Sequence, residues 1–66
     1  MSFIADYEYW LKHKRNLLRV QEAIQLKHIE NCKGDAFLMY GPMRRLEETR
    51  ADIKAIDFFL LNIPKE

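Results

Sequence analysis

The residues that break helices are confined to a few positions in this chain. The sequence holds only two glycines and two prolines, at Gly34, Gly41, Pro42 and Pro64. Two long stretches without a breaker are left, one before Gly34 and one between Pro42 and Pro64. Apolar residues recur at spacings of three and four along both stretches, and no segment alternates with the period of two that a half-buried strand requires. The chain is therefore predicted to be all-α.

The first stretch predicts a helix over about residues 3–33. Ser2 is a suitable N-cap, and Lys33 followed by Gly34 is a typical helix end, with a cation in the last turn and a glycine for the left-handed position. The main apolar stripe consists of Phe3, Tyr7, Trp10, Leu17 and Ile24. A second apolar set lies beside it and consists of Ile4, Leu11 and Leu18. We expect the main stripe to be the apolar side of this helix.

Several polar residues fall on this apolar side. They are Lys14, Gln21, Gln25 and His28. Polar residues in a helical seam can fix register and oligomeric state at a cost in stability. The other interpretation is that the stripe drifts around the helix and that these residues lie only at its rim.

Pro42 predicts the start of a second helix over about residues 42–62, because proline at the first helical position lacks only an N–H that has no helical partner. Its apolar stripe is Leu46, Ile53, Ile56, Leu60 and Ile63, with Thr49 at the remaining step. Pro64 follows the end of this helix. The two helices predict an antiparallel helical hairpin, a single domain over residues 1–66, with a connection over 34–41.

Four large apolar residues follow one another inside this predicted connection, at Phe37, Leu38, Met39 and Tyr40. Asp35 can cap a short helical turn across 36–40, which would fold Phe37, Leu38 and Tyr40 onto the end of the hairpin as a lid. The alternative leaves the same three residues exposed as a partner-binding site.

The predicted helices have unequal lengths, about 46 Å and about 30 Å. The second helix would then reach only to about His13, leaving the start of the first helix uncovered. Six of the eight aromatic residues gather at this end, away from the turn, and the candidate partner-binding residues there are Tyr7, Tyr9, Trp10, Phe58 and Phe59. Phe58 and Phe59 point about 100° apart on a helix, so only one of them is expected in the core.

A chain of 66 residues buries a small core and usually needs a disulfide, a metal or another subunit for stability. Cys32 is the only cysteine, which excludes a disulfide within the chain. We therefore expect a homo-oligomer, with a dimer in a four-helix arrangement favoured. The lone thiol fits a reducing cytoplasm, and no apolar run is long enough to span a membrane, so no membrane partner is expected.

The predicted first helix carries a basic cluster, and no acidic residue occurs between Tyr9 and Gln21. It consists of Lys12, Lys14, Arg15 and Arg19, and two further cations, Arg44 and Arg45, fall in the first turn of the predicted second helix. These six residues are candidates for contact with phosphate or nucleic acid. The alternative is a solvated helix face, with Arg44 paired to Glu47 or Glu48 at helical spacing.

Residues with the chemistry of catalysis or metal binding are sparse. His28 and Cys32 are four apart on one helix, but two ligands do not make a site unless a symmetric dimer supplies four. We find no Gly-rich phosphate loop and no nucleophile with an evident base, and expect neither an enzyme, a metal nor a cofactor. The sequence predicts a small helical interaction protein, a regulator, inhibitor or adaptor that binds a partner protein. The alternative is a nucleic-acid-binding accessory protein that uses the basic cluster.

Overall fold

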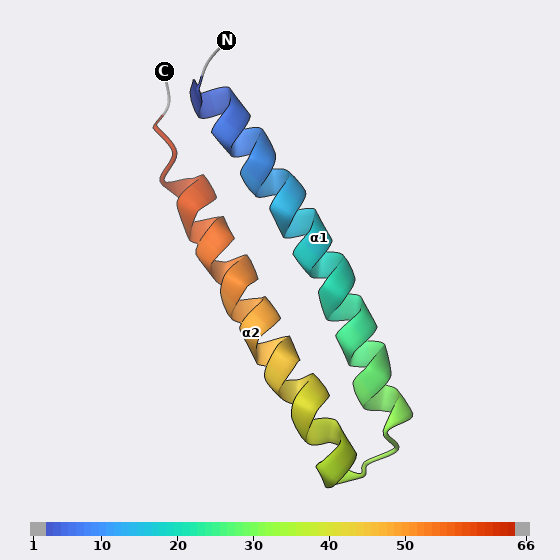
Figure 1. Cartoon of the computed structure of the whole chain (residues 1–66). Coiled ribbons are helices and arrows are strands. Elements are labelled where there is room, and N and C mark those ends of the chain that lie inside the picture. Colours follow the sequence, from blue (N-terminus) through green and yellow to red (C-terminus); the bar gives the residue numbers. More distant parts are fainter. Residues whose placement is uncertain (1–2, 65–66) are drawn as a thin grey trace.

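Two antiparallel helices make up the fold. The computed structural model describes residues 3–64, with helix α1 at Phe3–Asn31 and helix α2 at Ala36–Leu61. The helices lie side by side along their lengths, and the start of α1 and the end of α2 lie at the end opposite the turn (Figure 1). The molecule is a rod whose Cα trace extends 51 Å along its longest axis. The predicted all-α hairpin is confirmed for the described residues.

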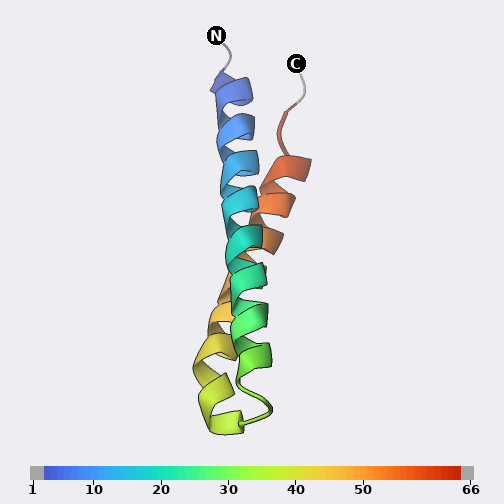
Figure 2. The same ribbon diagram turned by 90° about the vertical axis from the view of Figure 1, so that its right-hand side faces the viewer.

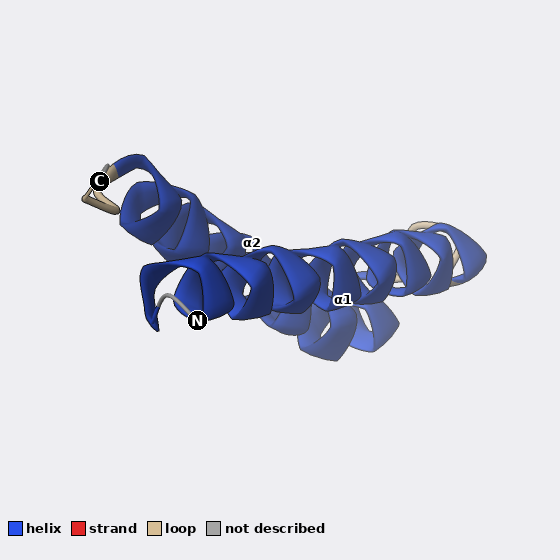
Figure 3. Cartoon of the chain, turned by 90° about the horizontal axis from the view of Figure 1, so that it is seen from above, coloured by secondary structure: helices blue, strands red, loops and turns tan. Residues whose placement is uncertain are grey.

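The helices cross at a shallow angle rather than running strictly parallel, as the views from the side and from above show (Figures 2 and 3). Such crossings arise where side chains at alternating spacings of three and four interdigitate. Neither described helix is long and apolar enough to cross a bilayer.

The turn needs only four residues, 32–35. Lys33 and Gly34 adopt left-handed backbone conformations, with φ of 51° and 80°. Asp35 then caps α2, its Oδ1 accepting hydrogen bonds from the backbone N–H groups of Phe37 at 3.0 Å and Leu38 at 3.3 Å. The predicted stop at Lys33-Gly34 is correct to within two residues, whereas the predicted cap at Ser2 lies outside the described residues.

The predicted connection over 34–41 and the predicted start of the second helix at Pro42 are wrong. The Asp35 cap starts α2 six residues earlier, so that Gly41 and Pro42 lie inside the helix. Proline there removes one hydrogen bond, the one that the Leu38 carbonyl would accept. The thiol of Cys32 points to that oxygen, with a sulfur–oxygen distance of 3.6 Å. The Cys32 thiol in the turn therefore partly replaces the hydrogen bond that the helix loses at Pro42.

The early start makes the helices nearly equal, at 29 and 26 residues, so the predicted overhang of α1 is also wrong. Leu11 was expected to lie beyond the end of α2. It is instead 2% exposed and forms the centre of the core with Leu18 and Ile56. Ile53, Leu60 and Ile63 pack against these three residues, as the predicted stripe of the second helix requires.

The two helices meet along one continuous seam. Its buried or half-buried members on α1 are Ile4, Glu8, Leu11, Arg15, Leu18, Glu22, Gln25 and Ile29, and Cys32 continues the set in the turn. Those on α2 and just beyond its end are Met39, Pro42, Leu46, Thr49, Ile53, Ile56, Leu60 and Ile63, and the half-buried Asp57 lies beside this set. Spacings of three and four alternate throughout both sets, which is the repeat of a coiled coil.

Polar contacts across the seam set its register. Gln25 Nε2 donates to Thr49 Oγ1 at 2.9 Å, and Arg50 Nε donates to Glu22 Oε2 at the same distance. Nearer the termini, Arg15 Nη1 donates to Asp57 Oδ1 at 3.1 Å. In these three contacts the α1 residue number falls from 25 to 15 while the α2 residue number rises from 49 to 57. This order is that of an antiparallel pair in one register.

The face of α1 that packs on α2 is one residue step away from the predicted one. The main stripe is exposed, including Trp10, Leu17 and Ile24, and the flanking residues Leu11 and Leu18 are buried. The reason is that every polar contact across the seam comes from residues in line with the flanking set. Of the four polar residues noted on the apolar side, Gln25 lies in the seam, and Lys14, Gln21 and His28 are exposed.

Candidate functional site

The aromatic side chains all lie outside the core. The chain has four phenylalanines, three tyrosines and one tryptophan, and each is exposed: Phe3, Tyr7, Tyr9, Trp10, Phe37, Tyr40, Phe58 and Phe59. The buried apolar residues are Leu11, Leu18, Cys32, Leu46 and Ile56. Aromatic side chains usually supply much of the energy of cores and interfaces, so their placement here marks candidate interaction surfaces.

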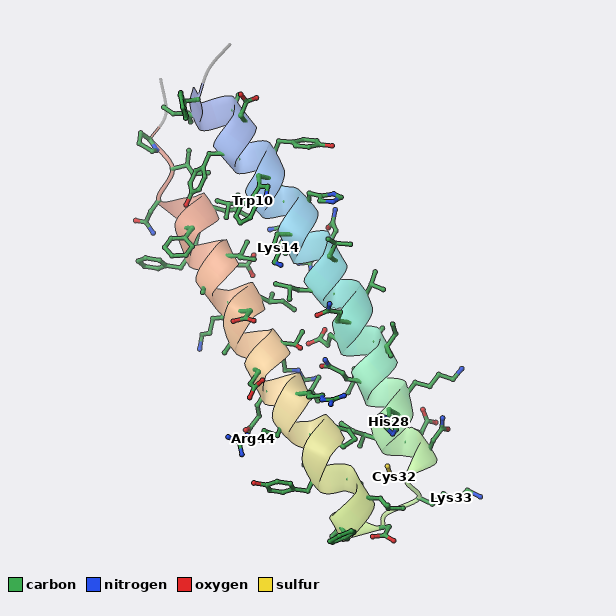
Figure 4. The ribbon with its side chains drawn as sticks, viewed as in Figure 1. Trp10, Lys14, His28, Cys32, Lys33 and Arg44 are labelled. Atoms are coloured by element: carbon green, nitrogen blue, oxygen red, sulfur yellow. The ribbon has the colours of Figure 1, made fainter. Side chains whose placement is uncertain are left out.

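A groove runs along the hairpin near the termini. It has a volume of about 280 Å³ and is walled by Tyr7, Trp10 and Lys14 of α1 and by Asp52, Ala55 and Phe59 of α2. Trp10 and Lys14 project from α1 toward the side of α2 (Figure 4). Of these residues, the sequence predicted a partner site at Tyr7, Trp10 and Phe59. Asp52 and Ala55 were missed, although a small residue four before Phe59 on the same helix face was a usable signal.

The core residues Leu11, Leu18 and Ile56 also line this groove. The groove therefore opens directly onto the hydrophobic core and is not separated from it by a polar rim. A partner that filled the groove would extend the same apolar packing that holds α1 to α2.

The remaining terminal aromatics do not line this groove. Tyr9 stacks on His13, with ring centroids 6.4 Å apart and planes 7° from parallel. Phe58 meets Phe59 edge to face at 6.1 Å. The expectation that one of this pair is core is wrong, because Ile56 and Leu60 occupy the seam and both phenylalanines fall between these two steps.

The turn end presents a second apolar surface. Phe37, Leu38 and Tyr40 are exposed, with Phe37 at 90%, so they form no lid over the hairpin. They stay outside because Asp35 starts the long α2 and not a separate helical turn that could fold back. The interpretation of these residues as an exposed surface is the one that agrees with the structure.

An open hollow of about 780 Å³ adjoins this surface, lined by Gly34, Ala36, Met39, Tyr40, Met43, Arg44 and Glu47. Met39 and Met43 were not among the predicted site residues. Methionine is flexible and polarizable and is common at surfaces that accept varied apolar partners. The sequence signal for this hollow was present in the run from Phe37 to Tyr40, but the predicted break at Pro42 separated that run from Met43.

The basic cluster of α1 is not one surface. Lys12 pairs with Glu8 at 3.0 Å, and Arg15 pairs with Asp57 at 3.1 Å across the seam. Lys14 is two residues from Lys12 and therefore about 200° away around the helix. Arg19 and Lys14 have no ion-pair partner among the described residues, but they do not share a face with each other.

Arg44 and Arg45 lie in the third turn of α2 and not in the first, so their predicted place at a helix N-terminus is wrong. The predicted pairing of Arg44 is confirmed with Glu48 at 3.8 Å, between side chains that are both largely exposed. Arg44 points away from α1 (Figure 4). The Glu22–Arg50 contact lies between these cations and the basic cluster, so the structure does not bring the two groups together.

The thiol of Cys32 points to backbone oxygens, at 3.2 Å from the His28 carbonyl and 3.6 Å from that of Leu38. Within residues 3–64, no group of three or more His, Cys, Asp or Glu side chains comes together in a way that could hold a metal ion.

Comparison of the chain with protein-family models, with curated proteins and with solved structures finds no match. A functional argument therefore depends on the surfaces of this chain alone.

Proposed function

We propose that this protein is a small helical interaction protein of the cytoplasm that self-associates as a dimer and acts as a regulator, inhibitor or adaptor by binding a partner protein. One observation carries the proposal, namely that every aromatic side chain of the chain is exposed. Aromatic residues are favoured interface anchors because they bury a large area at a small entropic cost. We propose binding rather than catalysis because these exposed groups are mainly apolar.

The small core supports the self-association. No side chain of the described residues is both large and fully buried, and the apolar core has only the five members named above. A single core in a chain of this size rarely supplies more than about 3–5 kcal/mol of stability, and a second subunit is one way to add to it. A dimer of two-helix hairpins gives a four-helix arrangement.

The nucleic-acid alternative receives less support. Two of the four cations in the cluster 12–19 are already paired with carboxylates. Of the others, Lys14 lies in an apolar groove together with Asp52. Binding to nucleic acid depends on several cations that face the phosphates together, and this surface does not supply them.

Partner capture tests the proposal. The immobilised chain is exposed to extract from its source cell, in the wild-type form and as the variants Tyr9→Ser, Phe37→Ser and Tyr40→Ser. Leu61→Ser is the matched control, because Leu61 is a large apolar residue that is 85% exposed but is not aromatic. We expect the wild type and the control to retain a partner protein in stoichiometric amount. At least one aromatic variant should fail to retain it.

The variants must keep the mass in solution and the melting temperature of the wild type, since each removes only an exposed side chain. The proposal fails if no protein is retained above the level of an unrelated helical hairpin, or if aromatic and control variants retain it equally. Retention of nucleic acid that disappears with added salt would favour the alternative.

A further inference from the structure

We infer that a second copy of this chain packs on the groove face, defined here as Tyr7, Trp10, Leu17 and Ile24 of α1 together with Phe59 of α2. The inference rests on the self-association proposed above and assigns it to one face. All five of these side chains are exposed in the single chain.

The α1 residues of the groove face repeat the spacing of the seam residues, each one position earlier in the sequence. Trp10 precedes the core residue Leu11, and Leu17 precedes Leu18. Their spacings, with Lys14 and Gln21 at the intervening steps, again alternate between three and four. Helix α1 therefore carries two adjacent coiled-coil stripes, about 100° apart. In a four-helix bundle each helix needs two such stripes, one for each neighbour, and α2 occupies only the first.

The groove face is continuous with the core. Leu11, Leu18 and Ile56 line the groove beside Trp10 and Phe59. A helix seated there would bury the open side of the same cluster that joins α1 to α2. It would thus complete the existing hydrophobic core, as expected of the interface between two halves of a bundle.

The exposed area is large enough for a dimer. The chain exposes 5717 Å², whereas a compact monomer of the same 8.0 kDa mass exposes about 4,450 Å². The surplus of about 1,300 Å² exceeds the ~800 Å² that each partner buries in a standard interface. A symmetric contact of standard size along this rod would remove about 60% of this surplus.

The charges of the groove suit a copy of the same surface. Lys14 and Asp52 line it from opposite helices, and neither takes part in the ion pairs found among the described residues. A two-fold interface brings each side chain of one copy near the face that carries its opposite in the other. A face for anionic lipid or nucleic acid would instead carry cations alone.

The test uses two exposed leucines on opposite sides of α1. Leu17 belongs to the groove face and is 49% exposed, whereas Leu26 is 43% exposed and lies nine residues on, half a turn away. We expect wild-type protein and Leu26→Glu to sediment at twice the 8.0 kDa chain mass at tens of micromolar concentration. Leu17→Glu should weaken self-association by about 100-fold or more, because a dimer would bury two unpaired carboxylates.

Trp10 gives an independent reading, since it is the only tryptophan and lies in the groove face. Its emission should move to longer wavelength when the wild type is diluted through the dissociation range. In Leu17→Glu it should stay at the long-wavelength position at every concentration, with unchanged helix content. If Leu17→Glu loses helix, Ile24→Glu replaces it, because Ile24 is more exposed at 64%.

Three outcomes overturn the inference. If the wild-type chain stays monomeric up to millimolar concentration, both this inference and the proposed self-association are wrong. A wild-type dimer that tolerates glutamate at both 17 and 24 removes only the assignment to this face. A monomeric chain whose Trp10 emission shifts on anionic vesicles identifies a lipid surface as the occupant. Failure to capture a partner protein, by contrast, leaves the dimer face intact and counts only against the proposed function.

Discussion

The thiol of Cys32 lies 3.6 Å from the carbonyl oxygen of Leu38, which is the oxygen that Pro42 leaves without a helical donor. The same sulfur lies 3.2 Å from the carbonyl of His28. Its single proton thus serves either the last turn of α1 or the first turns of α2. Since Cys32 is buried at the turn, one small side chain connects the two helices where the chain reverses.

A double-mutant cycle between Cys32 and Pro42 tests this connection. Cys32→Ala should lower the free energy of unfolding by about 1–2 kcal/mol, through a lost hydrogen bond and lost sulfur packing. In a Pro42→Ala background, the new N–H donates to the Leu38 carbonyl, so the thiol matters less there. The two effects should differ by about 0.5 kcal/mol or more in urea unfolding at one fixed protein concentration. Equal effects in both backgrounds would show that the thiol acts only by packing.

The hydrogen bond between Gln25 and Thr49 predicts an asymmetry between single and double substitutions. Thr49→Val should destabilise the hairpin by about 1–3 kcal/mol, because it leaves a half-buried amide of Gln25 without its acceptor. Adding Gln25→Leu should recover most of this loss, since the buried Oε1 of Gln25 already accepts no hydrogen bond. Urea unfolding of the four proteins measures both steps. A double variant as unstable as Thr49→Val would contradict the explanation.

The two kinds of ion pair should respond differently to loss of one partner. Asp57→Asn removes the negative charge that pairs with Arg15, whose side chain is only 26% exposed, and should cost about 1 kcal/mol. Glu48→Gln breaks a pair whose side chains are 67% and 70% exposed, and should cost less than about 0.5 kcal/mol. Thermal unfolding at low and at moderate salt gives both values. Equal losses would mean that the seam gives Arg15 no protection from solvent.

Two adjacent leucines separate the stability of the hairpin from its assembly. Leu18 is 6% exposed, so Leu18→Ala should lower the free energy of unfolding by about 2–5 kcal/mol at any protein concentration. Leu17 is 49% exposed, so Leu17→Ala should have little effect in dilute solution and a larger one where the protein is a dimer. Unfolding measured over a hundredfold range of concentration checks this. A large loss for Leu17→Ala in the monomer would place that residue in the hairpin core.

The architecture could be predicted from the sequence because the breakers leave two long apolar-patterned stretches. The seam of α2 was also predictable, since Ile53, Ile56 and Leu60 form one clear stripe. The start of α2 was not, because Pro42 is a strong local signal and the Asp35 cap is a weaker one. Pro42 is nevertheless buried inside α2, and such burial depends on packing between segments distant in sequence.

The packing face of α1 was mistaken for a similar reason. Two stripes with the same spacing lie side by side on this helix, and the more apolar one contains Trp10 and Leu17. The one that packs on α2 contains Arg15, Glu22 and Gln25, whose polarity is matched only by residues on the other helix. The paired residues are far apart in the sequence, so local sequence patterns do not reveal the pairing. The more apolar stripe thus remained on the surface, where it defines the candidate interaction site.

The antiparallel register also orders the events of folding. The contacts from Cys32 to Leu38, Gln25 to Thr49 and Arg15 to Asp57 close loops that grow in sequence separation from 6 to 24 to 42 residues. Because the entropy lost on closure rises with loop length, the chain is expected to close at the Asp35 turn and then to zip toward its termini. Substitutions near Cys32 should then slow folding, and those near Arg15 should mainly speed unfolding. The end that carries Trp10 and Phe59 would be the last part of the hairpin to form and the first to open.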